Sequence, residues 1–275
     1  MSKIHDEKRL EAVDSYNILN TLPEKEYDDI TRLASIICDV PVSLVSVISG
    51  SKQFFKSHYG VDISETPVDV AFCAHAIEST EDIFIVEDAR QDERFSANPL
   101  VVNDPNIVFY AGVPLIDEDK HALGTLCVID VQPKSLTDDQ VAALKILASQ
   151  VMQLFILRKS KLELAVKHNE LNRKTKRLNN IITSTKVGTW EWDVKQDVVQ
   201  INENWASMVG YTVDELQHVN LERFVSLIHK DDREKVQQEV EKCFRKEIDF
   251  YDVECRLVHK DGHIVWIITK GQVMS

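Results

Sequence analysis

A heptad repeat of leucine constrains the fold of this chain more than any other feature. The repeat lies in a stretch without proline or glycine and consists of Leu157, Leu164, Leu171 and Leu178. A strict seven-residue apolar repeat places one side chain per two turns on the same seam, which favours a left-handed coiled coil with a second helix. A helix that only connects domains does not need such a seam. The repeat therefore predicts a homodimer with paired helices over the long connecting segment, residues 136–185.

The seam is incomplete, and this leaves an alternative open. The companion positions four residues after each leucine are Lys161, His168, Thr175 and Ile182, of which only the last is apolar. A second register competes upstream and consists of Leu144, Val151, Phe155 and Leu162. In the same region a broader apolar stripe suits packing on a domain body, and it consists of Leu144, Leu147, Ala148, Val151 and Leu154. The alternative is one long amphipathic helix that lies against its own domain.

Length and charge limit the class of protein. The chain has 275 residues, which is enough for two ordinary domains, and its net charge is -13. An acidic surface repels nucleic acid and anionic lipid. Residues 158–177 are an exception, because eight basic and two acidic residues give this stretch a charge of +6. We interpret it as a solvated helix face and expect no nucleic-acid partner.

Cysteine usage and hydropathy indicate the compartment. The five cysteines show no CxxC pair, and their odd number argues against a secreted disulfide framework. Residues 1–9 are charged and lack the apolar core of a signal peptide. The longest apolar stretch, residues 142–157, is interrupted by Lys145, Gln150 and Gln153, so we expect no membrane span. The sequence predicts a cytoplasmic protein.

Residues 1–158 read as an α+β domain. Helical periodicity predicts one helix through Leu10 to Leu19 and a second that opens at Thr21 and continues through Ile37. Alternation and β-branched residues predict strands at 42–49, 53–59, 83–86, 106–116 and 122–130. Thr137 and Gln140 fit a capping box at the start of the long helix. This order predicts an antiparallel sheet that helices cover on one face.

Residues 186–275 show a different order of predicted strands and helices, and they form a second predicted domain. Two short strands, 188–194 and 198–201, precede three short helices and a longer helix that starts at His229. Two alternating segments, 250–258 and 264–273, follow and join at a Lys-Asp-Gly-His turn. The fold class is therefore α+β, with two domains that each have an antiparallel sheet and flanking helices, joined by the long helix.

Particular phrases in both segments carry family resemblances. The first set is Phe72-Cys-Ala-His-Ala-Ile, Asp88-Ala-Arg-Gln-Asp-Glu-Arg-Phe, Phe109-Tyr-Ala-Gly-Val-Pro-Leu and Leu123-Gly-Thr-Leu-Cys-Val-Ile-Asp. Over residues 5–158 the chain resembles a GAF domain of the bacterial signalling type. The second set is Gly188-Thr-Trp-Glu-Trp-Asp, Asn204-Trp-Ala-Ser-Met-Val-Gly-Tyr and His229-Lys-Asp-Asp-Arg. Over about residues 178–275 the chain resembles a PAS domain.

These resemblances imply a sensory region. A PAS sheet has five strands and only four can be placed, so a strand in the middle of the sheet would follow Ser275, and we expect a fragment of a longer protein. Families with this order, such as sensory histidine kinases of two-component systems and GGDEF-type diguanylate cyclases, usually continue into an output module. The residues present contain no Gly-rich phosphate loop, GxSxG, HExxH or GGDEF sequence, so we expect no catalytic residues here. A ligand or partner would act on the domains, and the paired helix would pass the signal on.

The GAF resemblance implies a ligand pocket. Its candidate lining residues are Phe55, Phe72, Cys73, His75, Phe109 and Tyr110, and ordinary core packing is the alternative. Cys73 and His75, read as part of a strand or turn, would share a face and could meet one ligand. No metal site is expected, because no second pair of ligands accompanies them. Alternating charges at Asp88, Arg90, Asp92 and Arg94 are interpreted as a network that stabilises a turn.

The cofactor and two rival functions stay open. The phrase around Cys73 matches GAF domains without a bilin, no cysteine in 220–227 could bind flavin covalently, and no histidine in 231–247 could ligate haem. One rival is a thiol-dependent enzyme that reduces free methionine sulfoxide, with Cys73 and Cys127 near each other, although that family's cysteine pattern is absent. The other rival is a pure protein-interaction module.

Overall fold

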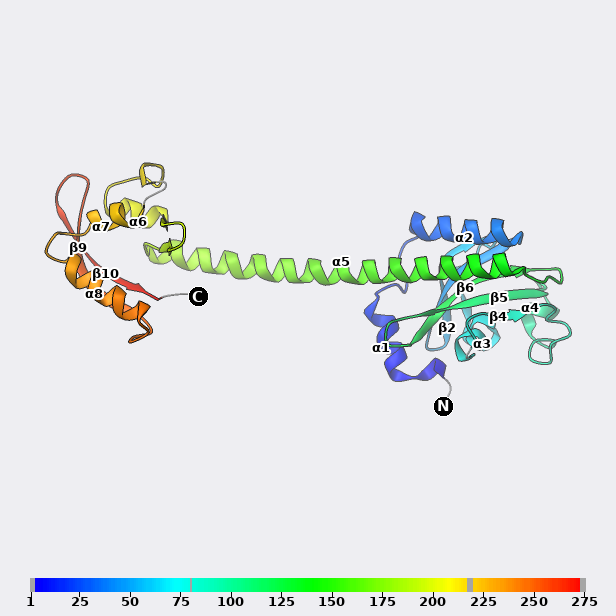
Figure 1. The fold of residues 1–275 in the computed structure, drawn as a ribbon. Coiled ribbons are helices and arrows are strands. Elements are labelled where there is room, and N and C mark those ends of the chain that lie inside the picture. The colour runs from blue at the N-terminus through cyan, green and yellow to red at the C-terminus, as the bar shows by residue number, and fades with distance from the viewer. Residues whose placement is uncertain (1–2, 80, 217–219, 273–275) are drawn as a thin grey trace. The chain divides into compact units, whose positions relative to one another are not determined.

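A computed structural model describes residues 3–79, 81–216 and 220–272. The chain divides into two compact units, Met1–Lys167 and His168–Ser275, and each is described by itself. Helix α5, Asp138–Thr185, begins in the first unit and ends in the second (Figure 1). With 48 residues it is roughly 70 Å long.

The first unit is built on a six-stranded antiparallel sheet with the order β3-β2-β1-β6-β5-β4. Its strands are β1 Val42–Ser49, β2 Lys52–Tyr59, β3 Glu65–Pro67, β4 Phe84–Val86, β5 Phe109–Ile116 and β6 Ala122–Asp130. The central strands β1, β6 and β5 are buried over nearly their whole length. Five of the six strands match the predicted segments. The sequence missed β3, because three residues are too few for an alternation to be visible.

Helices cover both faces of this sheet, so the prediction of one covered face was wrong. Helices α1 Glu7–Ser15, α2 Lys25–Cys38 and the start of α5 pack on one face, in a set of buried residues that includes Val45, Phe109 and Leu126 and that we call the helix core. Helix α3 Phe72–Glu78 and the short helix α4 Pro99–Val102 pack on the other face. Their core, which includes Leu44, Tyr110 and Cys127, is called the cavity core. Residues 60–108 show little hydrophobic periodicity in the sequence, and they form the layer on this second face of the sheet.

The first two helices are shorter than predicted. Helix α1 ends at Ser15, and α2 begins only at Lys25. In the segment between the two helices, Asn17 and Asn20 adopt positive φ angles of 48° and 56°, respectively. Asparagine tolerates this left-handed backbone, which cannot continue a helix. A pattern of apolar residues alone does not reveal such a break.

Helix α5 starts with the predicted capping box. The Thr137 backbone N–H donates to Gln140 Oε1 at 3.0 Å, and the Gln140 backbone N–H donates to Thr137 Oγ1 at 3.2 Å. By length and composition one 18-residue window of α5, with a mean hydropathy of 1.5, could cross a membrane, which the sequence analysis did not expect. Core helices pass the same test. The buried residues of α5, from Leu144 to Phe155, lie in the helix core.

The second unit contains two antiparallel strand pairs among its described residues. Strand β7 Trp190–Asp193 pairs with β8 Val198–Ile201, and β9 Tyr251–Val258 pairs with β10 Ile264–Gly271. The predicted end of the last strand, residue 273, lies outside the described residues. Helices α6 Glu203–Met208, α7 Leu221–Ser226 and α8 Arg233–Phe244 complete the unit. Its separate core includes Trp205, Leu227, Val253 and Leu257.

Candidate functional site

A cavity of about 100 Å³ lies between the sheet of the first unit and helix α3. Most of its lining is apolar, and the polar lining residues are Gln53, Thr66, Cys73, Tyr110 and Asp130. Cavities that hold drug-sized ligands usually measure about 300–1,000 Å³. This one has room for several water-sized molecules. The cavity therefore suits a ligand of only a few heavy atoms.

The structure separates the six predicted pocket residues into two groups. Phe55, Phe72, Cys73 and Tyr110 line the cavity. Phe109 belongs to the helix core instead, because successive residues of strand β5 point to opposite faces of the sheet.

His75 is also outside the cavity. The segment that was read as a strand or turn is helix α3, and residues two apart on a helix point to different sides. Cys73 is buried, whereas His75 is exposed, with its ring against the edge of Phe95 at a centroid distance of 4.8 Å. The prediction that Cys73 and His75 share a face was therefore wrong.

Two cysteines meet at the inner wall of the cavity. Cys73 Sγ on α3 lies 3.8 Å from Cys127 Sγ on β6, and both thiols are buried and free. The Tyr110 hydroxyl donates to Cys73 Sγ at 3.3 Å, and Gln53 Nε2 donates to the same sulfur at 3.1 Å. The sequence suggested that these two cysteines could lie near each other, and the packing of helix α3 on strand β6 brings them into contact.

The surroundings of the two sulfurs shift their acidities in opposite directions. Burial acts to raise the pKa of the Cys73 thiol, but hydrogen bonds to its sulfur outweigh burial and hold that pKa below the value of a free cysteine; the bonding groups are Cys127, Ser46, Thr125 and Tyr110. The hydrogen bond to Cys73, followed by burial, raises the pKa of Cys127 well above its usual range. Cys73 is thus the member of the pair that ionises first.

The alternating charges after β4 form the predicted turn network. Arg90 pairs with Asp88 at 2.8 Å, and Arg94 pairs with Asp92 at 2.6 Å. The Arg90 side chain is the main cause that lowers the pKa of Asp88 to about 2. Because each arginine is engaged by the acid two residues before it, this segment is a set of local ion pairs, not a clamp for a polar ligand.

The second unit has a larger and more aromatic cavity. It measures about 350 Å³, and its lining includes Trp190, Trp192, Phe224, Phe244 and Tyr251. Trp205 stacks on Phe224 with a centroid distance of 4.8 Å, as part of the core. This cavity is large enough for a ligand of ordinary size. Its aromatic wall includes residues from strands β7 and β9 and from helices α7 and α8.

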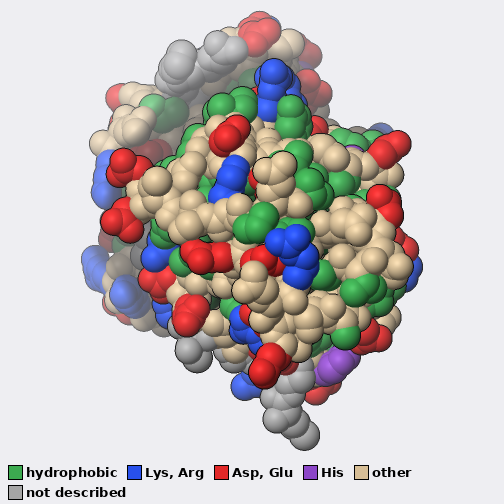
Figure 2. Space-filling view, turned by 90° about the vertical axis from the view of Figure 1, so that its right-hand side faces the viewer, with side chains coloured by type: hydrophobic (Ala, Val, Ile, Leu, Met, Phe, Trp, Pro, Cys, Tyr) green, Lys and Arg blue, Asp and Glu red, His purple; other side chains and the backbone are tan. Residues whose placement is uncertain are grey.

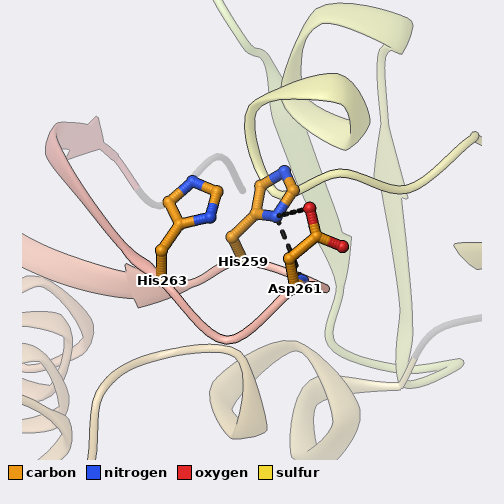
Figure 3. Close-up of side chains that lie close together, drawn as sticks. All are labelled: His259, Asp261 and His263. Carbon is orange, nitrogen blue, oxygen red and sulfur yellow. Dashed lines mark hydrogen bonds and ion pairs between the residues drawn. The ribbon is translucent and has the colours of Figure 1, made fainter.

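A group of possible metal ligands lies in the turn between β9 and β10 (Figure 3). The ligand atoms of His259, Asp261 and His263 lie within 4.8 Å of one another. The sequence analysis missed this group, although the His-x-Asp-x-His spacing is visible. His259 Nδ1 lies 3.5 Å from the Asp261 carboxylate, and the two imidazole rings stack at 4.0 Å. These contacts explain why the three side chains cluster: they pack against one another in a hairpin turn.

Charged side chains of both signs are scattered over the face that Figure 2 shows. In that view they are interspersed with apolar and other side chains. Among the described residues, this face presents no continuous patch of one charge. The candidate site is the Cys73 cavity of the first unit, where two buried thiols meet polar donors.

Comparison with known families identifies both units. Residues 23–155 match the GAF domain family, and residues 198–275 match the PAS fold. The chain is a GAF domain joined by a long helix to a PAS domain. This order is typical of the sensory regions of bacterial signalling proteins.

Three similar proteins illustrate that setting. The chain is 36% identical over 148 residues to a cyclic di-GMP phosphodiesterase of Pseudomonas aeruginosa, a match that covers 54% of this chain and 25% of the relative. It is 36% identical over 56 residues to the hybrid signal transduction histidine kinase A of Dictyostelium discoideum, covering 20% of this chain and 3% of that one. A sensory box histidine kinase/response regulator from Burkholderia thailandensis is 26% identical, with a TM-score of 0.31, over 36% of this chain and 71% of that chain. The chain thus spans a quarter or less of the curated relatives it matches.

Proposed function

We propose that this GAF–PAS chain is the cytoplasmic sensory region of a bacterial signalling protein and that it works as a parallel homodimer. The observation that carries the proposal is the exposed leucine seam of α5. Leu164, Leu171 and Leu178 are 68%, 62% and 60% exposed in the single chain. Apolar side chains at heptad spacing become buried when two such helices pair. Pairing through α5 would therefore remove the seam from water.

A charged junction links α5 to the GAF sheet where the seam begins. Glu24 Oε1 accepts from Lys56 Nζ on β2 and from Arg158 Nη1 on α5, both at 2.5 Å. The Lys56 side chain is completely buried, and its ammonium also donates to Thr21 Oγ1 and to the Leu22 carbonyl at 2.8 Å. Arg158 directly follows Leu157, the first leucine of the repeat. A shift of strand β2 would therefore act on α5 through Glu24.

In this proposal the chain receives the input and another module produces the output. A small molecule or a protein partner acts on the GAF or PAS domain and biases the packing of the paired helices. The output module would be a histidine kinase, a diguanylate cyclase or another enzyme of cyclic di-GMP metabolism, the class that includes the Pseudomonas relative. In this proposal the chain itself has a regulatory role, binds no nucleic acid and does not span a membrane.

The seam can be tested by charge substitution. Leu164→Lys combined with Leu171→Lys should convert the dimer to a monomer, which sedimentation equilibrium or light scattering after gel filtration would detect. Val166→Lys is the matched control, because Val166 is 67% exposed on the same helix but lies two positions off the seam. A mass that is the same in the doubly charged variant and the parent would refute the coiled-coil dimer.

The reductase alternative has one observation in its favour, the contact of Cys73 with Cys127 at 3.8 Å. The cavity is small for an amino-acid substrate, and among the described residues that line it Asp130 alone belongs to the charged types Asp, Glu, Lys and Arg. A free amino acid carries both an ammonium and a carboxylate, which need charged or polar partners when buried. We therefore favour the sensory function. Thiol-dependent turnover of methionine sulfoxide that Cys73→Ser abolishes would reverse this preference.

A further inference from the structure

The two sulfurs at the GAF cavity lie at different depths from its surface. Cys73 lines the cavity, whereas Cys127 does not and lies behind it on β6. Their Sγ atoms are 3.8 Å apart, and a disulfide bond is about 2.05 Å long, so a closure of roughly 1.8 Å would join them. A small reagent in the cavity would meet Cys73 first and would leave Cys127 free to react next.

Polar groups around Cys73 suit an anionic sulfur better than a thiol. Gln53 and Tyr110 each direct a donor at Cys73 Sγ in a wall that is mostly apolar. A thiol is a weak acceptor, and hydrogen bonds to an ionised group are roughly twice as strong. Two other cysteines differ in this respect, because burial raises the pKa of Cys38 to about 11 and also raises that of Cys255. Cys38 and Cys255 therefore serve as internal reference thiols.

We propose that Cys73 and Cys127 form a peroxide-reactive dithiol, and that a small hydroperoxide entering the GAF cavity oxidises the pair to an intramolecular disulfide. The cavity of about 100 Å³ admits hydrogen peroxide or a short alkyl hydroperoxide and excludes bulky ones. The role of this oxidation as a sensory input rests on the proposed function. The oxidation itself is a property of two thiols and does not depend on dimerisation.

The reaction proceeds in two balanced steps. The Cys73 thiolate attacks one peroxide oxygen, the O–O bond breaks, and the other oxygen takes a proton and leaves as water or an alcohol. The Cys127 thiol then attacks the Cys73 sulfenic acid, the S–S bond forms, the S–O bond breaks, and the hydroxyl leaves as water with the Cys127 proton. In total the two thiols lose two electrons and two protons, which the hydroperoxide accepts to give one water and one water or alcohol.

Peptide mass spectrometry of the full 275-residue chain tests the proposal. The reduced protein is treated with hydrogen peroxide, unfolded, alkylated and digested. We expect a linked peptide pair containing Cys73 and Cys127, with Cys38, Cys243 and Cys255 alkylated as free thiols. Cys127→Ser should instead leave a sulfenic acid on Cys73, which dimedone labels once the protein is unfolded in its presence. Cys38→Ser, which changes a buried cysteine of the helix core, should leave the linked pair unchanged.

Two further measurements keep the test decisive if Cys127→Ser does not fold. Tyr110→Phe removes one donor to the sulfur and should slow formation of the linked pair about tenfold. Cumene hydroperoxide should react far more slowly than hydrogen peroxide with the parent protein. Equal oxidation of all five cysteines, or none at Cys73, would overturn the inference. A dimer without the linked pair would contradict only this inference, and a monomer that forms the pair would contradict only the proposed dimeric function.

Discussion

Gly112 on strand β5 leaves the space that the buried Tyr110 phenol occupies. A Cβ atom at this position would lie 2.2 Å from the Tyr110 hydroxyl oxygen and 2.8 Å from Cζ. The ring cannot move freely, because Phe72 stacks on it at 5.2 Å. We expect Gly112→Ala to lower the free energy of unfolding by about 1–3 kcal/mol in urea titrations. Adding Tyr110→Phe should recover part of the loss, and simple additivity of the two costs would contradict the clash.

Asp232 gives the PAS domain a pH-dependent anchor. Hydrogen bonds from the Arg256 side chain, and then from its backbone N–H, lower the pKa of Asp232. A carboxyl whose pKa is lower in the folded state stabilises above its unfolded value of about 4 and loses that contribution as pH falls. Asp232→Asn should therefore destabilise the domain at neutral pH. The difference from the parent protein should shrink in acid, and thermal unfolding at several pH values would show it.

At the scale of elements, Glu24 holds helix α5 to the GAF sheet. Glu24→Ala would leave the buried Lys56 ammonium without its carboxylate and would free Arg158 on α5. Removing one partner of a buried ion pair is costly, and we expect a loss of about 3 kcal/mol in the free energy of unfolding. Glu26→Ala, an exposed acid two residues further on, should cost less than about 1 kcal/mol. Equal costs for the two variants would argue against the junction.

The elements also show which parts of the fold a sequence can reveal. Strands β1 and β6 match their predicted bounds, Val42–Ser49 and Ala122–Asp130, because β-branched residues and flanking turns define them locally. Helix α3 was missed because it has seven residues, five of them buried, so no polar face marks its period. The contact of Cys73 with Cys127 joins residues 54 positions apart and depends on how helix α3 packs on strand β6, which no local pattern contains. Phe109 and Tyr110 are neighbours on a predicted strand and so point to opposite faces, but the sequence does not show which of them faces the cavity.

For the whole molecule, separate cores predict separate unfolding. The helix and cavity cores lie in the first unit, and the third core, with Leu257, lies in the second. We expect two transitions in calorimetry. Leu126→Ala should lower the GAF transition and Leu257→Ala the PAS transition, each by about 2–5 kcal/mol of stability, because both side chains are buried. A single transition that both substitutions shift equally would show that the domains unfold as one.

The aromatic cavity of the PAS domain has a spectroscopic consequence. All four tryptophans of the chain, Trp190, Trp192, Trp205 and Trp266, lie in the second unit, and the GAF domain has none. Two of them line the PAS cavity. Indole emission from the unlabelled protein therefore reports on the PAS domain alone. A change of that emission when a reagent acts on the GAF cavity would be a remote optical signal, recorded without attaching a dye to either domain.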